Sequence, residues 1–185
     1  MSEFETYVKK VGDHHGHICF GIAMGTKMTL AAMKHLELDP HVKNKNLIVY
    51  AEIDRCMTDA IQVITGCTLG HRTLKYVDYG KFAVTFVNLT TGKAVRATIR
   101  ESFEIKGSPE EVVDKMERTP ESQIVNIQKV EVTIPETDLP GFPKRRANCS
   151  VCGERIMDGR EVYLEEQVLC RACANGKYYT ECKRE

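Results

Sequence analysis

The spacing of hydrophobic residues predicts three helices in the first two-thirds of the chain. Residues 18–36 are rich in Ala, Met and Leu and place large apolar side chains on one helical face. Residues 57–65 repeat apolar positions at i, i+3, i+4 and i+7, and Gly66 directly after them is typical of a helix C-cap. The sequence Ser-Pro-Glu-Glu at 108–111 is a capping box with proline at the first helical position, which indicates a third helix start.

Alternating and β-branched residues predict strands between these helices. Residues 47–53 form a compact apolar run, and residues 124–134 alternate apolar and polar side chains. Residues 82–89 and 94–100 flank the turn sequence Thr-Gly-Lys at 91–93 and are expected to form a hairpin. Because hairpins occur among the helices, we expect an α+β fold, a mixed helix and antiparallel-sheet core, rather than a doubly wound parallel sheet.

A linker is predicted at residues 135–148, PETDLPGFPKRRAN. This segment contains three prolines and a glycine and has no apolar periodicity, and proline resists the interior of both helices and sheets. We therefore divide the chain into an α+β core domain at 1–134, a linker at 135–148 and a C-terminal module at 149–185.

The C-terminal module carries four cysteines with the spacing Cys149-x2-Cys152-x17-Cys170-x2-Cys173. Two CxxC pairs separated in this way are typical of a zinc ion bound tetrahedrally by four thiolates. The alternative, two disulfides in a secreted module, is disfavoured because we identify no export signal at the N-terminus. A site closed by four cysteines leaves no open coordination position, so the predicted zinc is structural.

The residues around these cysteines predict a small zinc-ribbon or treble-clef module. A hairpin is expected within 155–169, and a short helix is expected to start near Cys170. Cys182 is left over, and its simplest interpretation is a solvent-exposed spare thiol. Residues 144–185 contain nine Lys or Arg against seven Asp or Glu, a net charge of +2 that is too small to favour DNA binding.

Composition narrows the classes of protein further. The chain has 26 basic and 26 acidic residues, and a formal net charge of zero argues against a general nucleic-acid binder. No apolar run approaches 18 residues, so we expect no membrane span. Eight cysteines without an export signal indicate a reducing compartment, and we therefore expect a cytoplasmic location.

A second group of candidate ligands lies near the N-terminus in the sequence Asp-His-His-Gly-His-Ile-Cys at 13–19. In an extended backbone His15, His17 and Cys19 would point the same way, since side chains alternate along a strand. They also precede a predicted helix, whose N-terminus would favour a thiolate at Cys19. Structural roles, such as capping or hydrogen bonding to the backbone, remain the alternative.

A third group follows the first predicted strand. Asp54 and Cys56 would share a face if the strand continued, and Cys56 would then meet the N-terminus of the next helix, where the pKa of a thiol is lowered. Asp59 could orient a metal ligand or accept a proton, or it could be an ordinary helix-capping residue. Cys67 lies in the sequence Thr-Gly-Cys-Thr-Leu-Gly, where it could face a ligand or simply fill the core.

Two kinds of chemistry suit these residues. A metal ion bound by His15, His17 and Cys56 would have three nitrogen or sulfur ligands and an open position, the pattern of a catalytic metal site, with Asp54 or Asp59 orienting a ligand or accepting a proton. Without metal, the same side chains could form a reactive cysteine paired with histidine. The residues alone do not separate these possibilities.

The two motifs together resemble a known family. The stretch HHGHICFGIAMGTKM at 14–28 resembles the HGHxCxG motif of the FmdE family of formylmethanofuran dehydrogenase proteins, and AEIDRCMTDAIQVITGCTLG at 51–70 resembles its second motif. The sequence Asp-Tyr-Gly-Lys at 78–81 before a strand is also similar. One departure is Phe20, at a position where the family commonly has proline. The resemblance covers nearly the whole chain.

The resemblance implies a candidate site and a biological setting. The site residues that it implies are His15, His17, Cys19, Cys56, Asp59 and Cys67, with Lys81 nearby. It also implies an α+β core, a C-terminal zinc finger, a homodimer and an anaerobic archaeal or bacterial setting connected with methanogenesis. The dehydrogenase of that name reduces CO2 at a molybdenum or tungsten pterin centre, but this chain has no ferredoxin-type cysteine run, so it is not expected to carry the redox centre.

Three hypotheses about function follow. The first is a metal-binding accessory protein of the formylmethanofuran dehydrogenase system, with a second metal in its core site and possible contacts to the dehydrogenase subunits. The second is a free-standing enzyme that uses Cys56 or Cys19 as nucleophile or redox thiol with His15 and His17. The third is a binding module whose zinc finger contacts a protein or, less readily, nucleic acid.

Overall fold

The computed structural model describes residues 1–182 and consists of two compact units, Met1–Thr133 and the chain from Ile134 onward. The α+β prediction is confirmed: the first unit combines helices with a five-stranded sheet in the order β2-β1-β3-β4-β5. The strands are β1 (Leu47–Ala51), β2 (Leu74–Tyr76), β3 (Ala83–Asn88), β4 (Ala94–Ile99) and β5 (Val125–Val130). The β1–β2 pair is parallel and the other three pairs are antiparallel.

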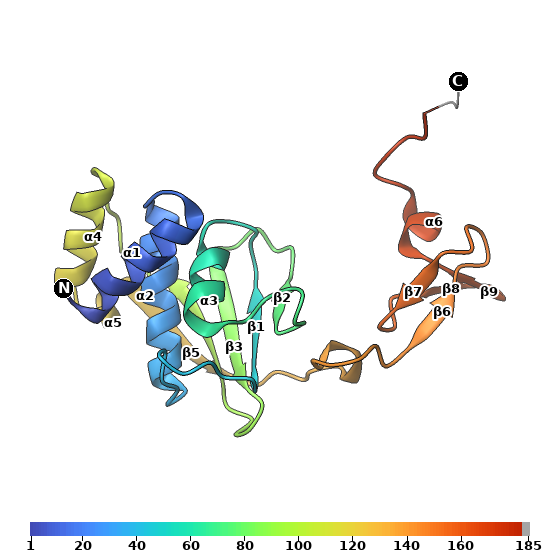
Figure 1. The fold of residues 1–185 in the computed structure, drawn as a ribbon, viewed down its shortest axis with the longest axis horizontal. Helices are drawn as coiled ribbons and strands as arrows, with labels where there is room; N and C mark the ends of the chain where they lie inside the picture. Colours follow the sequence, from blue (N-terminus) through green and yellow to red (C-terminus); the bar gives the residue numbers. More distant parts are fainter. Residues whose placement is uncertain (183–185) are drawn as a thin grey trace. The chain divides into compact units, whose positions relative to one another are not determined.

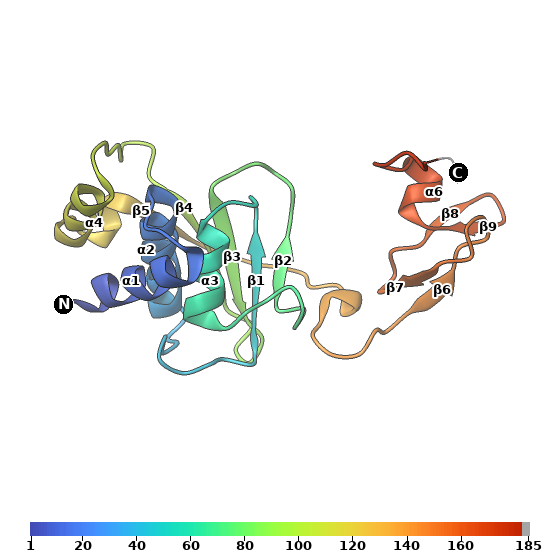
Figure 2. The same ribbon diagram turned by 45° about the horizontal axis from the view of Figure 1, so that its top comes forward.

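Helices cover one face of this sheet in both views (Figures 1 and 2). They are α1 (Glu3–His15), α2 (Phe20–His35), α3 (Met57–Thr65), α4 (Pro109–Arg118) and the single turn α5 (Glu121–Ile124). Residues of every second strand position, such as Val49, Phe86 and Val95, pack against apolar residues of these helices, for example Met24 and Met28. This alternation is the physical reason that the strand periodicity could be recognised in the sequence.

The predicted helices at 18–36 and 57–65 match α2 and α3, and Gly66 ends α3 in the left-handed conformation with φ of 75°. The capping box at Ser108 is also present at the start of α4. The strands are shorter than predicted: β1 ends at Ala51, and β5 covers only Val125–Val130 of the segment 124–134.

Helix α1 was not predicted, although its sequence carries the signals. Phe4, Tyr7, Val8 and Val11 are buried at helical spacing, and the Ser2 side chain accepts a hydrogen bond from the backbone N–H of Glu5 in a capping box. This helix matters for the candidate site because it ends at His15, where Gly16 takes the left-handed conformation with φ of 95°.

The second unit contains two small hairpins and one helical turn. Strand β6 (Arg146–Asn148) pairs with β7 (Arg155–Met157), and β8 (Val162–Leu164) pairs with β9 (Gln167–Leu169). A 3-10 turn, η1 (Glu136–Asp138), precedes them, and α6 (Arg171–Asn175) follows them. The segment predicted as a linker therefore contains regular structure, and its last three residues form a strand of the zinc module.

A buried ion pair ties the end of β1 to β4. The guanidinium of Arg96 donates two hydrogen bonds, of 2.6 and 2.7 Å, to the carboxylate of Glu52. These hydrogen bonds to Glu52 raise the pKa of Arg96 above its usual value. Glu52 follows the last residue of β1, so the pair fixes the point where the chain turns toward the loop before α3. Within residues 1–182, no helix is long and apolar enough to cross a membrane.

Candidate metal centres

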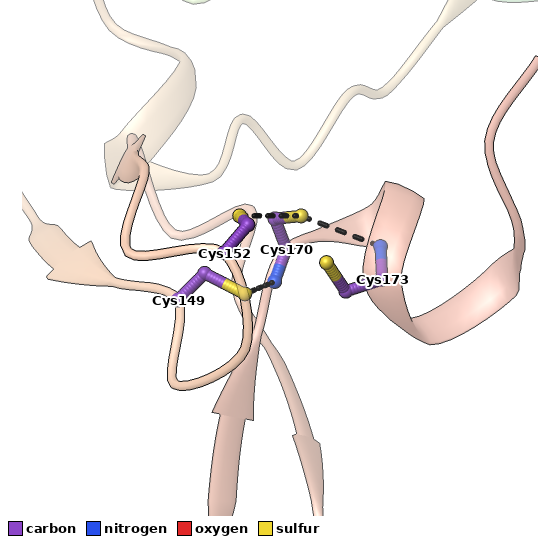
Figure 3. Close-up of side chains that lie close together, drawn as sticks. All are labelled: Cys149, Cys152, Cys170 and Cys173. Atoms are coloured by element: carbon purple, nitrogen blue, oxygen red, sulfur yellow. Dashed lines mark hydrogen bonds between the residues drawn. The ribbon is translucent and has the colours of Figure 1, made fainter. Parts of the chain in front are cut away.

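The four cysteines of the second unit converge on one point (Figure 3). The sulfur atoms of Cys149, Cys152, Cys170 and Cys173 all lie within 4.8 Å of one another, and the Cys152 and Cys170 sulfurs are 3.9 Å apart. Four sulfurs at about 2.3 Å from a zinc ion form a tetrahedron with edges of about 3.8 Å. The observed spacing therefore fits zinc, and the predicted structural zinc site is confirmed.

Backbone geometry presents each pair of sulfurs. The turn after Cys149 is closed by a 2.9 Å hydrogen bond from the backbone N–H of Gly153 to the Cys149 carbonyl, and Gly153 has φ of 74°. On the other side Cys170 is the N-cap of α6, and its sulfur accepts a 3.4 Å hydrogen bond from the backbone N–H of Cys173. A tight turn and a helix start thus supply two ligands each.

The electrostatics of the four thiols favour a bound cation. Backbone hydrogen bonds from Cys152 and Cys170 lower the pKa of Cys149 to about 6. In contrast, the hydrogen bond of the Cys173 thiol to Cys170, burial and the other neighbouring sulfurs raise the pKa of Cys173 to about 12. Four thiolates so close together repel one another, and a divalent cation removes this conflict because it requires the deprotonated form of each ligand.

The described residues of the first unit also contain a group of potential metal ligands. Donor atoms of His15, His17 and Cys19 lie within 4.8 Å of one another, and the two imidazole rings have centroids 4.8 Å apart. The three residues do not lie on one continuous strand: His15 ends α1, and Cys19 is the N-cap of α2. The short connection between α1 and α2, rather than the alternation of side chains along a strand, brings the three side chains together.

Asp59 holds His15 in one orientation. The Nδ1 atom of His15 lies 2.6 Å from Oδ2 of Asp59, which stands in the first turn of α3. This pairing places the imidazole proton on Nδ1 and leaves Nε2 as the ring nitrogen with a free lone pair. A carboxylate bound to one ring nitrogen while the other faces a metal is a common arrangement around metal-ligating histidines.

Cys56 lies beside Cys19 but outside the group of three. A Cβ atom added to Gly21 would stand 3.6 Å from the Cys56 sulfur and 3.7 Å from the Cys19 sulfur, so Gly21 lies against both thiols. From the sequence we expected His15, His17 and Cys56 as the metal ligands and Cys19 as a further site residue, whereas the structure groups Cys19 with the two histidines. Cys56 therefore lies next to one member of the group, Cys19.

Burial raises the pKa of Cys56, and the hydrogen bond of its thiol to Cys19 raises it further. The sequence had suggested the opposite direction, because Cys56 precedes α3 and a helix N-terminus favours a thiolate. The helix contributes little here, since the Cys56 side chain does not cap it. In the absence of a cation, Cys56 is therefore a neutral thiol.

Close packing of α2 against α3 fixes the relative positions of Cys19 and Cys56. A Cβ atom added to Gly25 would lie 2.7 Å from the Cα atom of Met57, far inside van der Waals contact. Only glycine allows the two backbones to approach so closely at this point. Gly25 is in the second turn of α2 and Met57 begins α3, so this contact lies near both cysteines.

One of the predicted site residues, Cys67, lies elsewhere. Cys67 follows Gly66 at the opposite end of α3 from Cys56; it is 1% exposed, and its sulfur donates a 3.5 Å hydrogen bond to the Leu47 carbonyl. Burial raises the pKa of Cys67, as expected for a thiol in an apolar core. The structure therefore separates Cys67 from the histidine cluster.

Lys81 is exposed, with its ammonium 5.8 Å from the centre of the Tyr79 ring. The next residue, Phe82, packs against Phe20 with ring centroids 6.3 Å apart. Because Phe20 directly follows Cys19, the Lys81 loop lies next to the start of α2. The Phe20 ring, which stands where the family commonly has proline, thus forms part of the surface beside the candidate site.

Comparison with known protein families supports the resemblance that the motifs suggested. Residues 14–137 match the family model described as FmdE, molybdenum formylmethanofuran dehydrogenase operon. The chain belongs to the FmdE family. The match begins one residue before His15 and includes all the candidate residues of the core. Residues 142–179 match the prokaryotic dksA/traR C4-type zinc finger, which covers all four clustered cysteines.

Two relatives extend the comparison. A probable S-adenosyl-L-methionine-binding protein of Archaeoglobus fulgidus is 31% identical over 210 aligned positions, which cover 97% of this chain and 55% of that protein. The chain thus spans about half the length of this curated relative. The crystal structure of a tungsten formylmethanofuran dehydrogenase FmdE-like protein from Syntrophus aciditrophicus matches with a TM-score of 0.63 at 25% identity, covering 96% of this chain and 95% of that one.

Proposed function

We propose that this FmdE-family protein binds a second metal ion in its core domain, through His15, His17 and Cys19. The observation that carries this proposal is the convergence of the three donor atoms within 4.8 Å, together with the 2.6 Å contact between Asp59 and Nδ1 of His15. Two imidazoles and a thiolate suit zinc and neighbouring divalent transition metals. Bound there, such an ion would supply a Lewis acid with at least one position open for a ligand.

The surroundings of the three donors support this role. His17 is exposed, whereas His15 and Cys19 are partly buried, so the group opens to solvent on the His17 side. This differs from the zinc module, where four sulfurs enclose the ion. The core site is therefore open to a small ligand, and Cys56, which lies beside Cys19, is a candidate protein ligand for the remaining position.

We further propose that the protein acts as a cytoplasmic companion of formylmethanofuran dehydrogenase and forms a homodimer. Support for the companion role comes from the family description, which names the dehydrogenase operon, and from the FmdE-like structural relative. Light scattering coupled to gel filtration tests the dimer, which would have twice the 20.9 kDa mass of the chain. Co-purification of the tagged chain with dehydrogenase subunits tests the association.

The alternative of a metal-free thiol enzyme has less support. It requires Cys56 or Cys19 to be ionised at neutral pH, but burial and the Cys19 thiol raise the pKa of Cys56. The zinc finger could also contact a protein or nucleic acid. The zero net charge of the chain argues against binding to nucleic acid.

Metal content per chain tests the core site. We expect two equivalents in the wild-type protein and one in the variant His17→Ala/Cys19→Ala, as measured by elemental analysis after loading with zinc and removal of excess metal. The variant His71→Ala/Cys182→Ala is the matched control, because it removes one exposed histidine and one exposed cysteine outside the cluster. Only one equivalent in the wild-type protein would refute the proposal.

Cobalt substitution then distinguishes the ligand sets. The visible spectrum of a cobalt-substituted protein reports the number of thiolate ligands, since sulfur-to-metal charge transfer grows with each one. If Cys56 is a fourth ligand, Cys56→Ala will weaken this absorption while metal is retained. An unchanged spectrum in Cys56→Ala would limit the protein ligands to the group of three.

A further inference from the structure

A cavity lies at the C-terminal end of α3, whereas the histidine cluster lies near the N-terminal end of this helix. Its volume is about 350 Å³, and two loops form its walls. Lys43 and Lys45 come from the connection between α2 and β1, and His71 comes from the connection between α3 and β2. Since α3 has nine residues, this cavity is about 13 Å along the helix from Cys56.

The floor of the cavity is fixed by internal hydrogen bonds. The Thr65 hydroxyl donates to the Ile61 carbonyl at 2.6 Å and accepts from the backbone N–H of Cys67 at 3.0 Å. The Thr73 hydroxyl accepts a 3.1 Å hydrogen bond from the backbone N–H of Thr68. These groups are occupied by the fold itself, so the side chains on the walls are the ones that remain to contact a ligand.

The charged or titratable side chains that line this cavity, Lys43, Lys45 and His71, are all basic. The segments 40–51 and 60–77 contain no aspartate or glutamate, although acidic and basic residues are equally numerous in the whole chain. Throughout residues 1–182, Lys43, Lys45 and His71 have no carboxylate partner, whereas Lys93 pairs with Glu37 at 3.0 Å. Lysines that line a cavity and have no carboxylate partner create a positive potential there.

Gly66 allows Lys43 to lie along the cavity wall. A Cβ atom added to Gly66 would be 3.7 Å from Cγ of Lys43 and 3.8 Å from its Cδ, so the lysine stem passes directly over this glycine. Gly66 also has φ of 75°, a conformation that other residues rarely adopt. The stem is therefore packed against the end of α3, with the ammonium group at its outer end.

We propose that this cavity binds the phosphate group of a small phosphate monoester, with Lys43 and Lys45 as its cationic contacts. Lysine ammonium groups bind phosphate oxygens as point charges, and such hydrogen bonds are about twice as strong as neutral ones. A volume of about 350 Å³ exceeds the size of a phosphate ion and falls in the range of pockets for small molecules. The site is separate from the metal cluster and does not depend on it.

Calorimetric titration with ribose 5-phosphate tests this proposal, with ribose as the uncharged control. We expect the wild-type chain to bind ribose 5-phosphate and not ribose. The variant Lys43→Ala/Lys45→Ala should weaken binding at least tenfold. The matched variant Lys106→Ala/Lys129→Ala, which removes two exposed lysines from other parts of the first unit, should stay within about twofold of wild type.

Three results would overturn the proposal. The first is no binding of ribose 5-phosphate to the wild-type chain. The second is an equal loss in both double-lysine variants, which would indicate a general effect of net charge. The third is loss of binding in His17→Ala/Cys19→Ala, which would place the phosphate on the core metal instead. Equal melting temperatures of the four proteins, measured by circular dichroism, establish that the comparison concerns folded chains.

Discussion

The two groups of metal ligands differ in how the surrounding protein supports them. The C-terminal group uses four sulfurs, and its own hydrophobic cluster consists of three buried residues, Cys149, Ile156 and Leu169. The N-terminal group uses two histidines and a cysteine, and it stands at the edge of a large core built from helices and sheet. In the first case the metal holds the fold together, whereas in the second the fold holds the ligands.

This contrast separates the structural zinc site from the proposed core metal site. A module with so few buried apolar side chains cannot offset the conformational entropy of its chain without the zinc. The core domain has ample buried surface and does not need a metal to fold. Its histidine cluster is therefore free to keep an open face, which a structural site cannot do without losing a ligand.

Cys149→Ser should have the largest effect on folding stability. It tests most directly whether the second unit, unlike the first, depends on its metal. Structural zinc contributes on the order of 10–16 kcal/mol to the folding of small zinc modules, and serine is a poor ligand. We expect the second unit to unfold while Met1–Thr133 stays folded, as seen by loss of one set of amide signals in two-dimensional NMR. Cooperative loss of both sets would show that the units do not fold independently.

Gly25→Ala should have the second-largest effect, a loss of stability of the first unit, because it disturbs the contact between α2 and α3 that supports the core site. The added methyl group would meet the Met57 backbone at 2.7 Å and force α2 away from α3. Overpacking of this kind costs about 1–3 kcal/mol, so chemical denaturation of the first unit should show a loss of this size. The matched control is Gly70→Ala, where an added Cβ has no neighbour within 4 Å and negligible loss is expected.

Asp59→Asn should have the smallest effect on stability and act only on the proposed core metal. The amide is a weaker acceptor for the His15 proton, and changes in such outer partners typically lower metal affinity about 10- to 100-fold. Competition with a fluorescent chelator should show this loss at one of two sites, with the four-cysteine site unchanged. Equal affinity in Asp59→Asn and wild type would mean that Asp59 does not orient a metal ligand.

Much of the scaffold followed from local sequence, because its signals act over a few residues. The end of α3 at Gly66 and the start of α4 at Ser108 depend on capping groups close in the chain. Helix α1 carried equally clear signals, with a capping box at Ser2 and apolar residues at helical spacing. From the sequence we assigned no element to these residues, although their signals are of the same local kind.

The sequence by itself determined the zinc module, since two CxxC pairs at this spacing specify four thiolates around one ion. It also determined which residues were candidates for a core site. Only the tertiary structure decided that Asp59 meets His15 across 44 residues, that Cys19 joins the two histidines, and that Cys67 does not. The physical reason is that local patterns fix helices and turns, whereas contacts between distant segments depend on how helices pack, here on the close approach at Gly25.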